Sequence, residues 1–271
     1  MENPEIGEIV DINGIETNIH ITDDGNPLLL IHGSGPGVSA YANWRKVLPE
    51  LSQNFQILAP DMIGFGYSSK LDKPFELSDF INHLVAILDH FQIDKTDLIG
   101  NSFGGALALQ LANQHPERVK KLILMGSAGS KFSLTEGLNS VWGYQPSIGN
   151  MRRLLDIFAY DRNLVTDELA ELRYKASIRE GVQEAFSSMF PEPRQQWVDA
   201  MSLSDEELSR IDCPVLLVHG LEDKVIPVSS SEYLQRKLPN AELVLFNRCG
   251  HWVQIEKTEE FIKKVKSFLL H

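Results

Sequence analysis

The sequence predicts an α/β protein with a mostly parallel, eight-stranded sheet flanked by helices. Short apolar runs, which suit strands buried on both faces, alternate with helical patterns over much of the chain. After the sixth strand this alternation stops, and residues 128–207 show helical patterns only. We therefore expect a helical lid over residues 128–207, inserted into a core formed by residues 1–127 and 208–271.

The first two strands are expected to form a hairpin. Residues 6–12 and 15–21 alternate roughly between apolar and polar side chains around Asn13-Gly14, which is a strong signal for a two-residue turn. The remaining strands are predicted at residues 27–31, 55–59, 96–99, 119–125, 215–219 and 241–246. The core helices are predicted at residues 41–53, 77–92, 106–112, 229–237 and 258–269, and the lid helices at 151–160, 167–179, 181–189 and 194–202.

Composition excludes several classes of protein. The 271 residues include 43% hydrophobic side chains, which excludes a disordered chain, and the formal net charge of −12 argues against nucleic-acid binding. No apolar run reaches the roughly eighteen residues of a membrane span, and the acidic N-terminus does not resemble a signal peptide. Cys213 and Cys249 fall at opposite ends of neighbouring strands, so we expect free thiols. These features predict a cytoplasmic protein.

The sharpest local signal is Gly100-x-Ser102-x-Gly104, which lies between an apolar strand and an Ala/Leu-rich helix. This is the spacing of a nucleophile elbow, a tight strand-to-helix turn that lifts the central side chain above the sheet. The neighbours two positions away must be small, and the helix that follows directs its positive end at the same place. The pattern predicts that Ser102 is a nucleophile.

A serine nucleophile needs a base, and the histidine needs a carboxylate that fixes its tautomer. Of the eight histidines, His251 follows the last strand on a loop that can reach over the elbow, whereas His219 ends a strand and is expected to be structural. Asp223 follows the strand at 215–219, and Glu222 is its rival by position. We favour Asp223 because it lies on the turn that enters the next helix.

An oxyanion intermediate needs backbone donors. The amide of Phe103, directly after the nucleophile, is expected to supply one of them. The second is expected from the glycine-rich loop after the strand at 27–31, where Ser34 lies. Residues Ser34 and Phe103 are therefore the predicted oxyanion hole.

Taken together, these motifs resemble the α/β-hydrolase superfamily and, within it, the meta-cleavage product hydrolases. The order Ser102, Asp223, His251 along the chain is the α/β-hydrolase order. The stretches that carry the resemblance are HGSGPGVSAYANW (32–44), GNSFGG (100–105), MGSAG (125–129), YKASIREG (174–181) and RCGHW (248–252).

The resemblance implies a hydrolase that cleaves the C5–C6 bond of 2-hydroxy-6-oxohexa-2,4-dienoates without a cofactor or metal. It implies a substrate pocket formed by Asn43, Asn101, Arg179 and Trp252. Arg179 would hold the substrate carboxylate, and the two asparagines would face its 2-oxo or enol end. Ile148, Phe158 and Trp142 would line the pocket for the C6 substituent. The family resemblance also implies a homo-oligomer.

Two other functions fit the same residues. One is a plain carboxylesterase with the same triad, and the other is a ligand receptor built on a hydrolase scaffold. Turnover above roughly 1 s⁻¹, as is typical of enzymes, would exclude the receptor. In every case the expected ligand is a small molecule.

Overall fold

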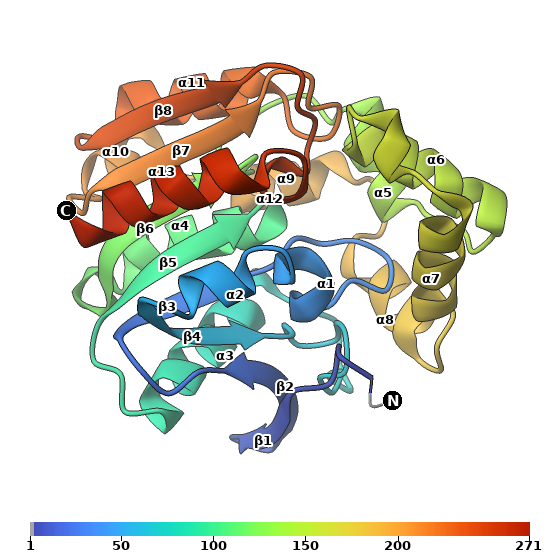
Figure 1. The fold of residues 1–271 in the computed structure, drawn as a ribbon, viewed down its shortest axis with the longest axis horizontal. Helices are drawn as coiled ribbons and strands as arrows, with labels where there is room; N and C mark the ends of the chain where they lie inside the picture. The colour runs from blue at the N-terminus through green and yellow to red at the C-terminus, as the bar shows by residue number, and fades with distance from the viewer. Residues whose placement is uncertain (1–2) are drawn as a thin grey trace.

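The computed structural model describes residues 3–271, which contain one mixed sheet of eight strands (Figure 1). The strand order is β1-β2-β4-β3-β5-β6-β7-β8, with antiparallel pairing of β2 to both β1 and β4 and parallel pairing from β4 onward. The strands are β1 (Glu8–Ile12), β2 (Ile15–Ile21), β3 (Asn26–Ile31), β4 (Phe55–Pro60), β5 (Thr96–Asn101), β6 (Val119–Met125), β7 (Val215–Gly220) and β8 (Ala241–Phe246). The predicted fold class is confirmed.

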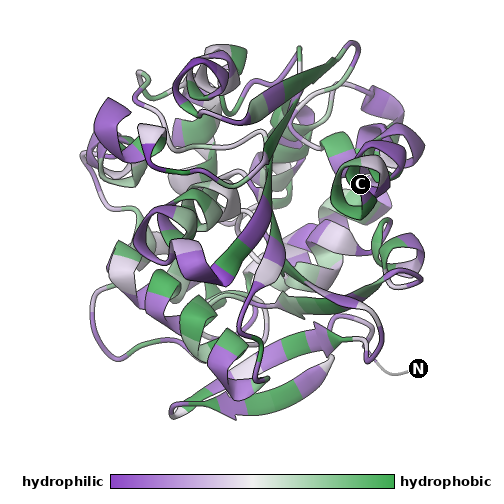
Figure 2. Cartoon of the chain, turned by 90° about the vertical axis from the view of Figure 1, so that its left-hand side faces the viewer, coloured by the Kyte–Doolittle hydropathy of each residue, from purple (hydrophilic) through white to green (hydrophobic). Residues whose placement is uncertain are grey.

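Helices cover both faces of this sheet. The core helices are α1 (Ala40–Trp44), α2 (Leu48–Leu51), α3 (Leu77–His90), α4 (Phe103–Gln114), α11 (Val228–Lys237), α12 (Val253–Glu256) and α13 (Thr258–Leu270). Alternate residues of β3 enter different cores: Leu29 and Ile31 pack on the side of α3 and α4, whereas Leu28 and Leu30 pack on the side of α1, α2 and α13. In Figure 2 the interior strands are mostly hydrophobic, while the β1–β2 hairpin at the bottom alternates between both colours.

Six further α-helices lie between β6 and β7 within the described residues. They are α5 (Glu136–Trp142), α6 (Ile148–Phe158), α7 (Asp167–Ser177), α8 (Val182–Met189), α9 (Gln195–Met201) and α10 (Asp205–Ser209). Figure 1 shows α5 to α8 grouped beyond one end of the sheet. The sequence patterns identified α6 to α9, but they did not identify the short helices α5 and α10.

Some boundaries differ from the sequence prediction. The helix expected over residues 41–53 is interrupted: α1 ends at Trp44 and α2 begins at Leu48. Pro49 explains the break, because proline has no N–H to donate and its ring would clash with the carbonyl of Arg45 in a continuous helix. At the first turn of α2 the missing N–H costs nothing.

Two further features are the cysteine thiols and the lengths of the helices. Cys213 and Cys249 are both free, the first half-buried and the second buried. Among the helices of residues 3–271, none combines the length and apolar character that a membrane crossing requires.

Candidate active site

Ser102 occupies a strained turn between β5 and α4. Its backbone has φ 56° and ψ −115°, a conformation that non-glycine residues rarely adopt. A Cβ on Gly100 would lie 2.4 Å from the carbonyl oxygen of Gly104, and a Cβ on Gly104 would lie 2.3 Å from the carbonyl oxygens of Ile31 and His32. Both glycines are therefore required by close packing, and the strained turn presents the Ser102 side chain at the sheet edge.

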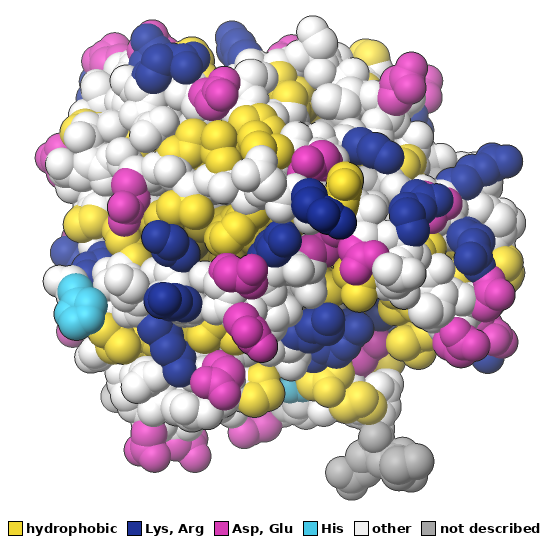
Figure 3. Space-filling model, turned by 45° about the horizontal axis from the view of Figure 1, so that its top comes forward, with side chains coloured by type: hydrophobic (Ala, Val, Ile, Leu, Met, Phe, Trp, Pro, Cys, Tyr) yellow, Lys and Arg dark blue, Asp and Glu magenta, His cyan; other side chains and the backbone are white. Residues whose placement is uncertain are grey.

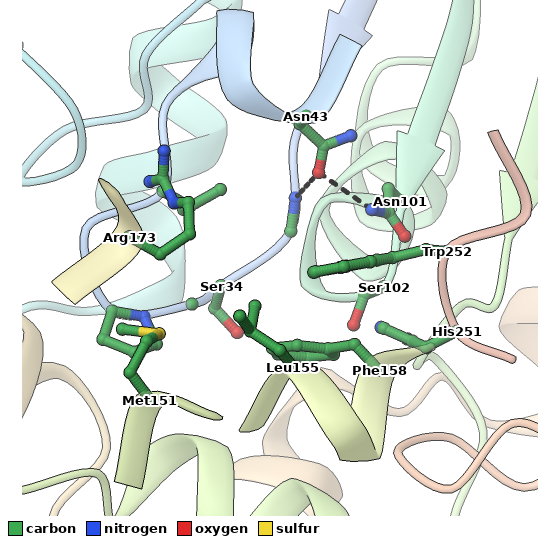
Figure 4. Close-up of a pocket in the computed structure, with 14 residues that line it drawn as sticks. Ser34, Asn43, Asn101, Ser102, Met151, Leu155, Phe158, Arg173, His251 and Trp252 are labelled. Carbon is green, nitrogen blue, oxygen red and sulfur yellow. Dashed lines mark hydrogen bonds between the residues drawn. The ribbon is translucent and has the colours of Figure 1, made fainter. Parts of the chain in front are cut away.

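The His251 ring lies beside Ser102 and is held by Asp223. Its Nδ1–H donates to Asp223 Oδ2 over 2.7 Å, which leaves Nε2 free to accept a proton. Figure 4 shows the Ser102 hydroxyl pointing toward this ring. The rival carboxylate, Glu222, instead accepts the backbone N–H of Cys249 at 2.9 Å and so anchors the loop that carries His251. The structure thus brings together the three side chains that the sequence selected.

Asp223 is buried, and both of its carboxylate oxygens accept hydrogen bonds. Its Oδ1 accepts the backbone N–H groups of Val225 and Ile226, at 2.7 and 3.0 Å. Burial by itself would raise the pKa of Asp223, but the facing charge of His251 and the hydrogen bonds from His219 and His251 outweigh it. The pKa of Asp223 therefore lies below its ordinary value, and the carboxylate stays ionised beside His251.

His219 is the structural histidine that its strand position predicted. It is fully buried, and its Nε2–H faces two acceptors, the carbonyl of Ile226 at 3.0 Å and Asp223 Oδ2 at 3.2 Å. Its Nδ1 accepts the hydroxyl of Ser231 at 2.7 Å. His219 thus supports the same carboxylate oxygen that His251 uses.

The predicted oxyanion donors are the backbone amides near Ser102, those of Ser34 and Phe103. Phe103 is the first residue of α4, and the first amides of a helix have no acceptor within that helix. Ser34 lines the same pocket as Ser102. The loop of Ser34 is braced by His32, which donates from Nδ1 to the Gly33 carbonyl and accepts the Met62 N–H at Nε2, over 2.8 and 3.0 Å.

A cavity of about 70 Å³ opens directly above Ser102 (Figure 4). Asn43, Asn101 and Trp252 line it, as the family resemblance implied. Asn43 Oδ1 accepts from Asn101 Nδ2 at 2.9 Å and from the Gly33 N–H at 3.4 Å. The other polar atom of each side-chain amide, Asn43 Nδ2 and Asn101 Oδ1, is buried and has no hydrogen-bond partner among the described residues. The pair therefore retains one donor and one acceptor.

Arg173 is the arginine that lines this cavity, whereas Arg179, the arginine expected there, does not line it. Arg179 donates to the Gly66 carbonyl at 2.7 Å and stacks on the Tyr67 ring at 3.8 Å, so packing on that loop holds it outside the cavity lining. Arg173 lines the cavity and lies across it from His251 in Figure 4. No local motif marks Arg173, which stands one residue before the YKASIREG stretch.

The apolar wall of the cavity comes from α6. Met151, Leu155 and Phe158 line it. Of the three residues expected there from the sequence, Phe158 is present, whereas Ile148 is exposed and does not line the cavity. Trp142 is buried behind it, where it donates to Ser34 Oγ at 3.0 Å and stacks on Phe190 at 4.5 Å.

Residues 3–271 contain no group of three or more His, Cys, Asp or Glu side chains arranged to hold a metal ion.

Comparison with known proteins agrees with this geometry. Residues 26–258 match the family model for the α/β hydrolase fold. A 2-hydroxy-6-oxo-2,4-heptadienoate hydrolase from Pseudomonas putida is 53% identical, over 98% of this chain and 97% of the relative. A 2-hydroxymuconate semialdehyde hydrolase from a Pseudomonas species is 52% identical, over 98% of this chain and 95% of the relative. The structure of a meta-cleavage product hydrolase from Pseudomonas fluorescens superposes with a TM-score of 0.97 at 52% identity, covering 98% of both chains.

The chain belongs to the α/β-hydrolase family. Within that family it is a meta-cleavage product hydrolase, an enzyme that hydrolyses a carbon–carbon bond in dienoates formed by ring fission during aromatic catabolism.

Proposed function

We propose that Ser102, His251 and Asp223 cleave the C5–C6 bond of 2-hydroxy-6-oxohexa-2,4-dienoates and that Arg173 holds the substrate carboxylate. The observation that carries this proposal is a single cavity in which an elbow serine and a carboxylate-bound histidine face a largely buried arginine. An ester carries no carboxylate that would require such an arginine. Residues 128–207 act in this proposal as the lid, because α6 supplies the apolar wall and α7 supplies Arg173.

The reaction begins with ketonisation of the dienol, in which C5 gains a proton and the C5–C6 bond becomes cleavable. Ser102 then attacks the C6 carbonyl while His251 Nε2 takes its proton, and the amides of Ser34 and Phe103 hold the oxyanion. Cleavage of C5–C6 places the electron pair on the dienolate fragment, which leaves as 2-hydroxypenta-2,4-dienoate. Water activated by His251 hydrolyses the acyl-enzyme to a carboxylic acid. Asp223 keeps the imidazolium oriented throughout.

The polar end of the substrate is assigned to the asparagine pair. Asn43 Nδ2 and Asn101 Oδ1 are the unpartnered donor and acceptor, and a 2-hydroxy or 2-oxo carboxylate offers matching groups. Trp252 packs over the same cavity and stacks on Phe158 at 5.2 Å, which links the His251 loop to the lid.

We further propose that the preferred C6 substituent is small, such as methyl. The most similar relatives include a heptadienoate hydrolase, whose named substrate carries a methyl group at C6. The catalytic cavity is small, at about 70 Å³, and Phe158 forms part of its wall. A homo-oligomer remains part of the proposal, and size-exclusion chromatography with light scattering tests it.

The deciding experiment compares the turnover of dienoates that carry methyl, isopropyl or phenyl at C6 with the turnover of short-chain esters. Stopped-flow absorbance of the dienolate band measures dienoate turnover. We expect the methyl compound to be turned over fastest. Ser102→Ala should lower turnover by about 10⁴-fold or more, because the nucleophile is lost while binding remains. Hydrolysis of esters alone would show that the enzyme is a carboxylesterase, and dienoate turnover retained in Ser102→Ala would refute the serine mechanism.

A further inference from the structure

A second cavity, of about 110 Å³, adjoins the one above Ser102. The two cavities share Val38, Asn43, Arg173 and Trp252 as walls. The second cavity extends away from the nucleophile, between the α1 region, helix α7 and the segment after His251. It does not contain Ser102 or His251, and the mechanism described above makes no use of it.

The lining of this second cavity is strongly cationic. Its eleven described lining residues include Arg45, Lys46 and Arg173 and no carboxylate. Arg45 donates to the Ala42 carbonyl at 3.1 Å, and Lys46 donates to the Ile255 carbonyl at 3.3 Å. Among residues 3–271, no carboxylate lies within ion-pair distance of either side chain, in contrast with Arg173, which pairs with Glu5 at 3.1 Å. Two cations are therefore left without a counter-charge beside the shared wall.

This local excess of positive charge runs against the charge of the whole molecule. The chain has a formal net charge of −12, and on the face shown in Figure 3 basic and acidic side chains are interspersed. The two unpaired cations, Arg45 and Lys46, attract anions to this cavity, and such focusing raises association rates by about 10- to 10³-fold.

Two buried polar atoms in the lining add a second observation. Gln254 is 1% exposed, and its Nε2 donates to the Asn43 carbonyl at 3.1 Å, yet its Oε1 has no partner among the described residues. Asn43 Nδ2 is unpartnered in the same way. A buried polar atom without a partner costs about 1–3 kcal/mol, so the lining offers one acceptor and one donor to a ligand. A 2-hydroxy carboxylate carries both complementary groups.

We propose that this cavity is a separate binding position for carboxylates, the cationic vestibule, defined by Arg45, Lys46, Arg173, Asn43, Gln254 and Trp252. An anionic ligand is captured there and then passes Arg173 into the catalytic cavity. This inference rests on the proposed function for its natural ligand, the dienoate. After C5–C6 cleavage the acyl group remains on Ser102 and the dienoate fragment lies on the Arg173 side, so the same vestibule is its way out.

The first test measures binding without catalysis. Trp252 lines both cavities, so its fluorescence can follow the association of hexa-2,4-dienoate, a simple carboxylate, in a stopped-flow instrument. We expect the double variant Arg45→Gln/Lys46→Gln to associate about tenfold more slowly at an ionic strength of about 0.01 M. The difference should disappear near 1 M, where charges are screened. An association rate equal to that of the unmodified protein at low salt would overturn the proposal.

The matched control removes two cations elsewhere. Lys263→Gln/Lys264→Gln changes the net charge by the same amount at exposed positions of α13 that line neither cavity. This control should associate with hexa-2,4-dienoate at the unmodified rate, and an equal slowing would show that only net charge matters. Lys46 is exposed, so Lys46→Glu alone provides a variant that folds and should slow association further.

The second test uses catalysis. For a dienoate, kcat/KM of Arg45→Gln/Lys46→Gln should fall about tenfold at low salt, and the fall should be much smaller for a neutral ester. Equal losses on both substrates would indicate a structural defect and contradict the vestibule. If the unmodified enzyme binds hexa-2,4-dienoate with this salt dependence but hydrolyses only esters, the proposed function fails while the vestibule stands.

Discussion

At the scale of single residues, the arginine of the cavity is held in place by distant parts of the chain. Arg173 Nη1 pairs with Glu5 at 3.1 Å, and its Nη2 donates to the Gly37 carbonyl. Burial lowers the pKa of Arg173, and the Glu5 charge acts against that shift. A guanidinium stays charged even so, and its planar donors suit a carboxylate. Arg173 is therefore fixed before a substrate arrives.

This placement predicts different effects of replacing Arg173 and Arg179. Arg173→Gln should lower kcat/KM for a dienoate by about 10²-fold or more, because a charge-assisted contact to a carboxylate contributes about 1.5–3 kcal/mol and preorganisation adds to it. Arg179→Gln should change it by less than about threefold. Steady-state kinetics with a dienoate and a neutral ester checks both variants. A larger loss in Arg179→Gln than in Arg173→Gln would reverse the assignment.

At the scale of elements, the β5–α4 turn depends on backbone contacts that leave no room for side chains. A Cβ on Gly104 would clash with the carbonyls of Ile31 and His32, and a Cβ on Gly100 would clash with the carbonyl of Gly104. These contacts join the end of β3, which leads into the loop of Ser34, to the start of α4, which carries Phe103. The two proposed oxyanion donors are thereby held in a fixed relation to each other.

Gly104→Ala should accordingly damage both stability and activity. The added methyl group would lie 2.3 Å from two carbonyl oxygens, and overpacking of this kind costs about 1–3 kcal/mol or more. We expect a lower urea midpoint and a loss of about 10²-fold in kcat, as for the removal of one oxyanion donor. Gly149→Ala in α6 is the control, because its Cβ meets nothing within 4 Å and should stabilise the helix slightly. Equal midpoints for both variants would contradict this account.

At the scale of the whole molecule, the loop of Ser34 is built around a neutral histidine, and this makes stability depend on pH. Burial lowers the pKa of His32 to about 4, well below the ordinary 6.5. Its Nε2 accepts the Met62 N–H, so a proton there would face another donor. The unfolded chain takes up the proton more readily than the folded one. The contribution to stability is therefore complete above pH 6.5, falls between 6.5 and about 4, and is lost below that.

This titration can be measured by urea unfolding at pH 7.5 and pH 5. His32 should account for about 2 kcal/mol of the stability lost between the two pH values. In His32→Gln that share of the loss should be absent, whereas His90→Gln, at an exposed position, should lose as much as the unmodified protein. His83→Gln provides a second variant, because burial also lowers the pKa of His83 to about 4. A pH dependence unchanged in both buried-site variants would refute the explanation.

The sequence by itself determined the eight strands and the longer helices along the chain, the elbow at Ser102 and the candidates Asp223 and His251. Each of these depends on local signals: periodicity that follows burial, glycines that a tight turn requires, and loops that follow strands at one edge of a parallel sheet. The same reasoning missed the break between α1 and α2, because helical periodicity continues across it. It favoured Asp223 over Glu222, and in the folded loops Asp223 bonds His251 whereas Glu222 bonds the Cys249 amide.

The tertiary structure alone decided which arginine enters the cavity and what surrounds it. Arg173 and Arg179 lie six positions apart, and the YKASIREG stretch favoured Arg179, which does not line the cavity. Glu5 and Gly37, far away along the chain, hold one of them at the cavity, while Gly66 and Tyr67 hold the other outside it. Tertiary packing likewise places His219 beside Asp223, and it places Arg45 and Lys46 beside the second cavity. Local sequence fixes how a segment folds, but the direction of a long charged side chain depends on the counter-charges and carbonyls that other segments bring to it.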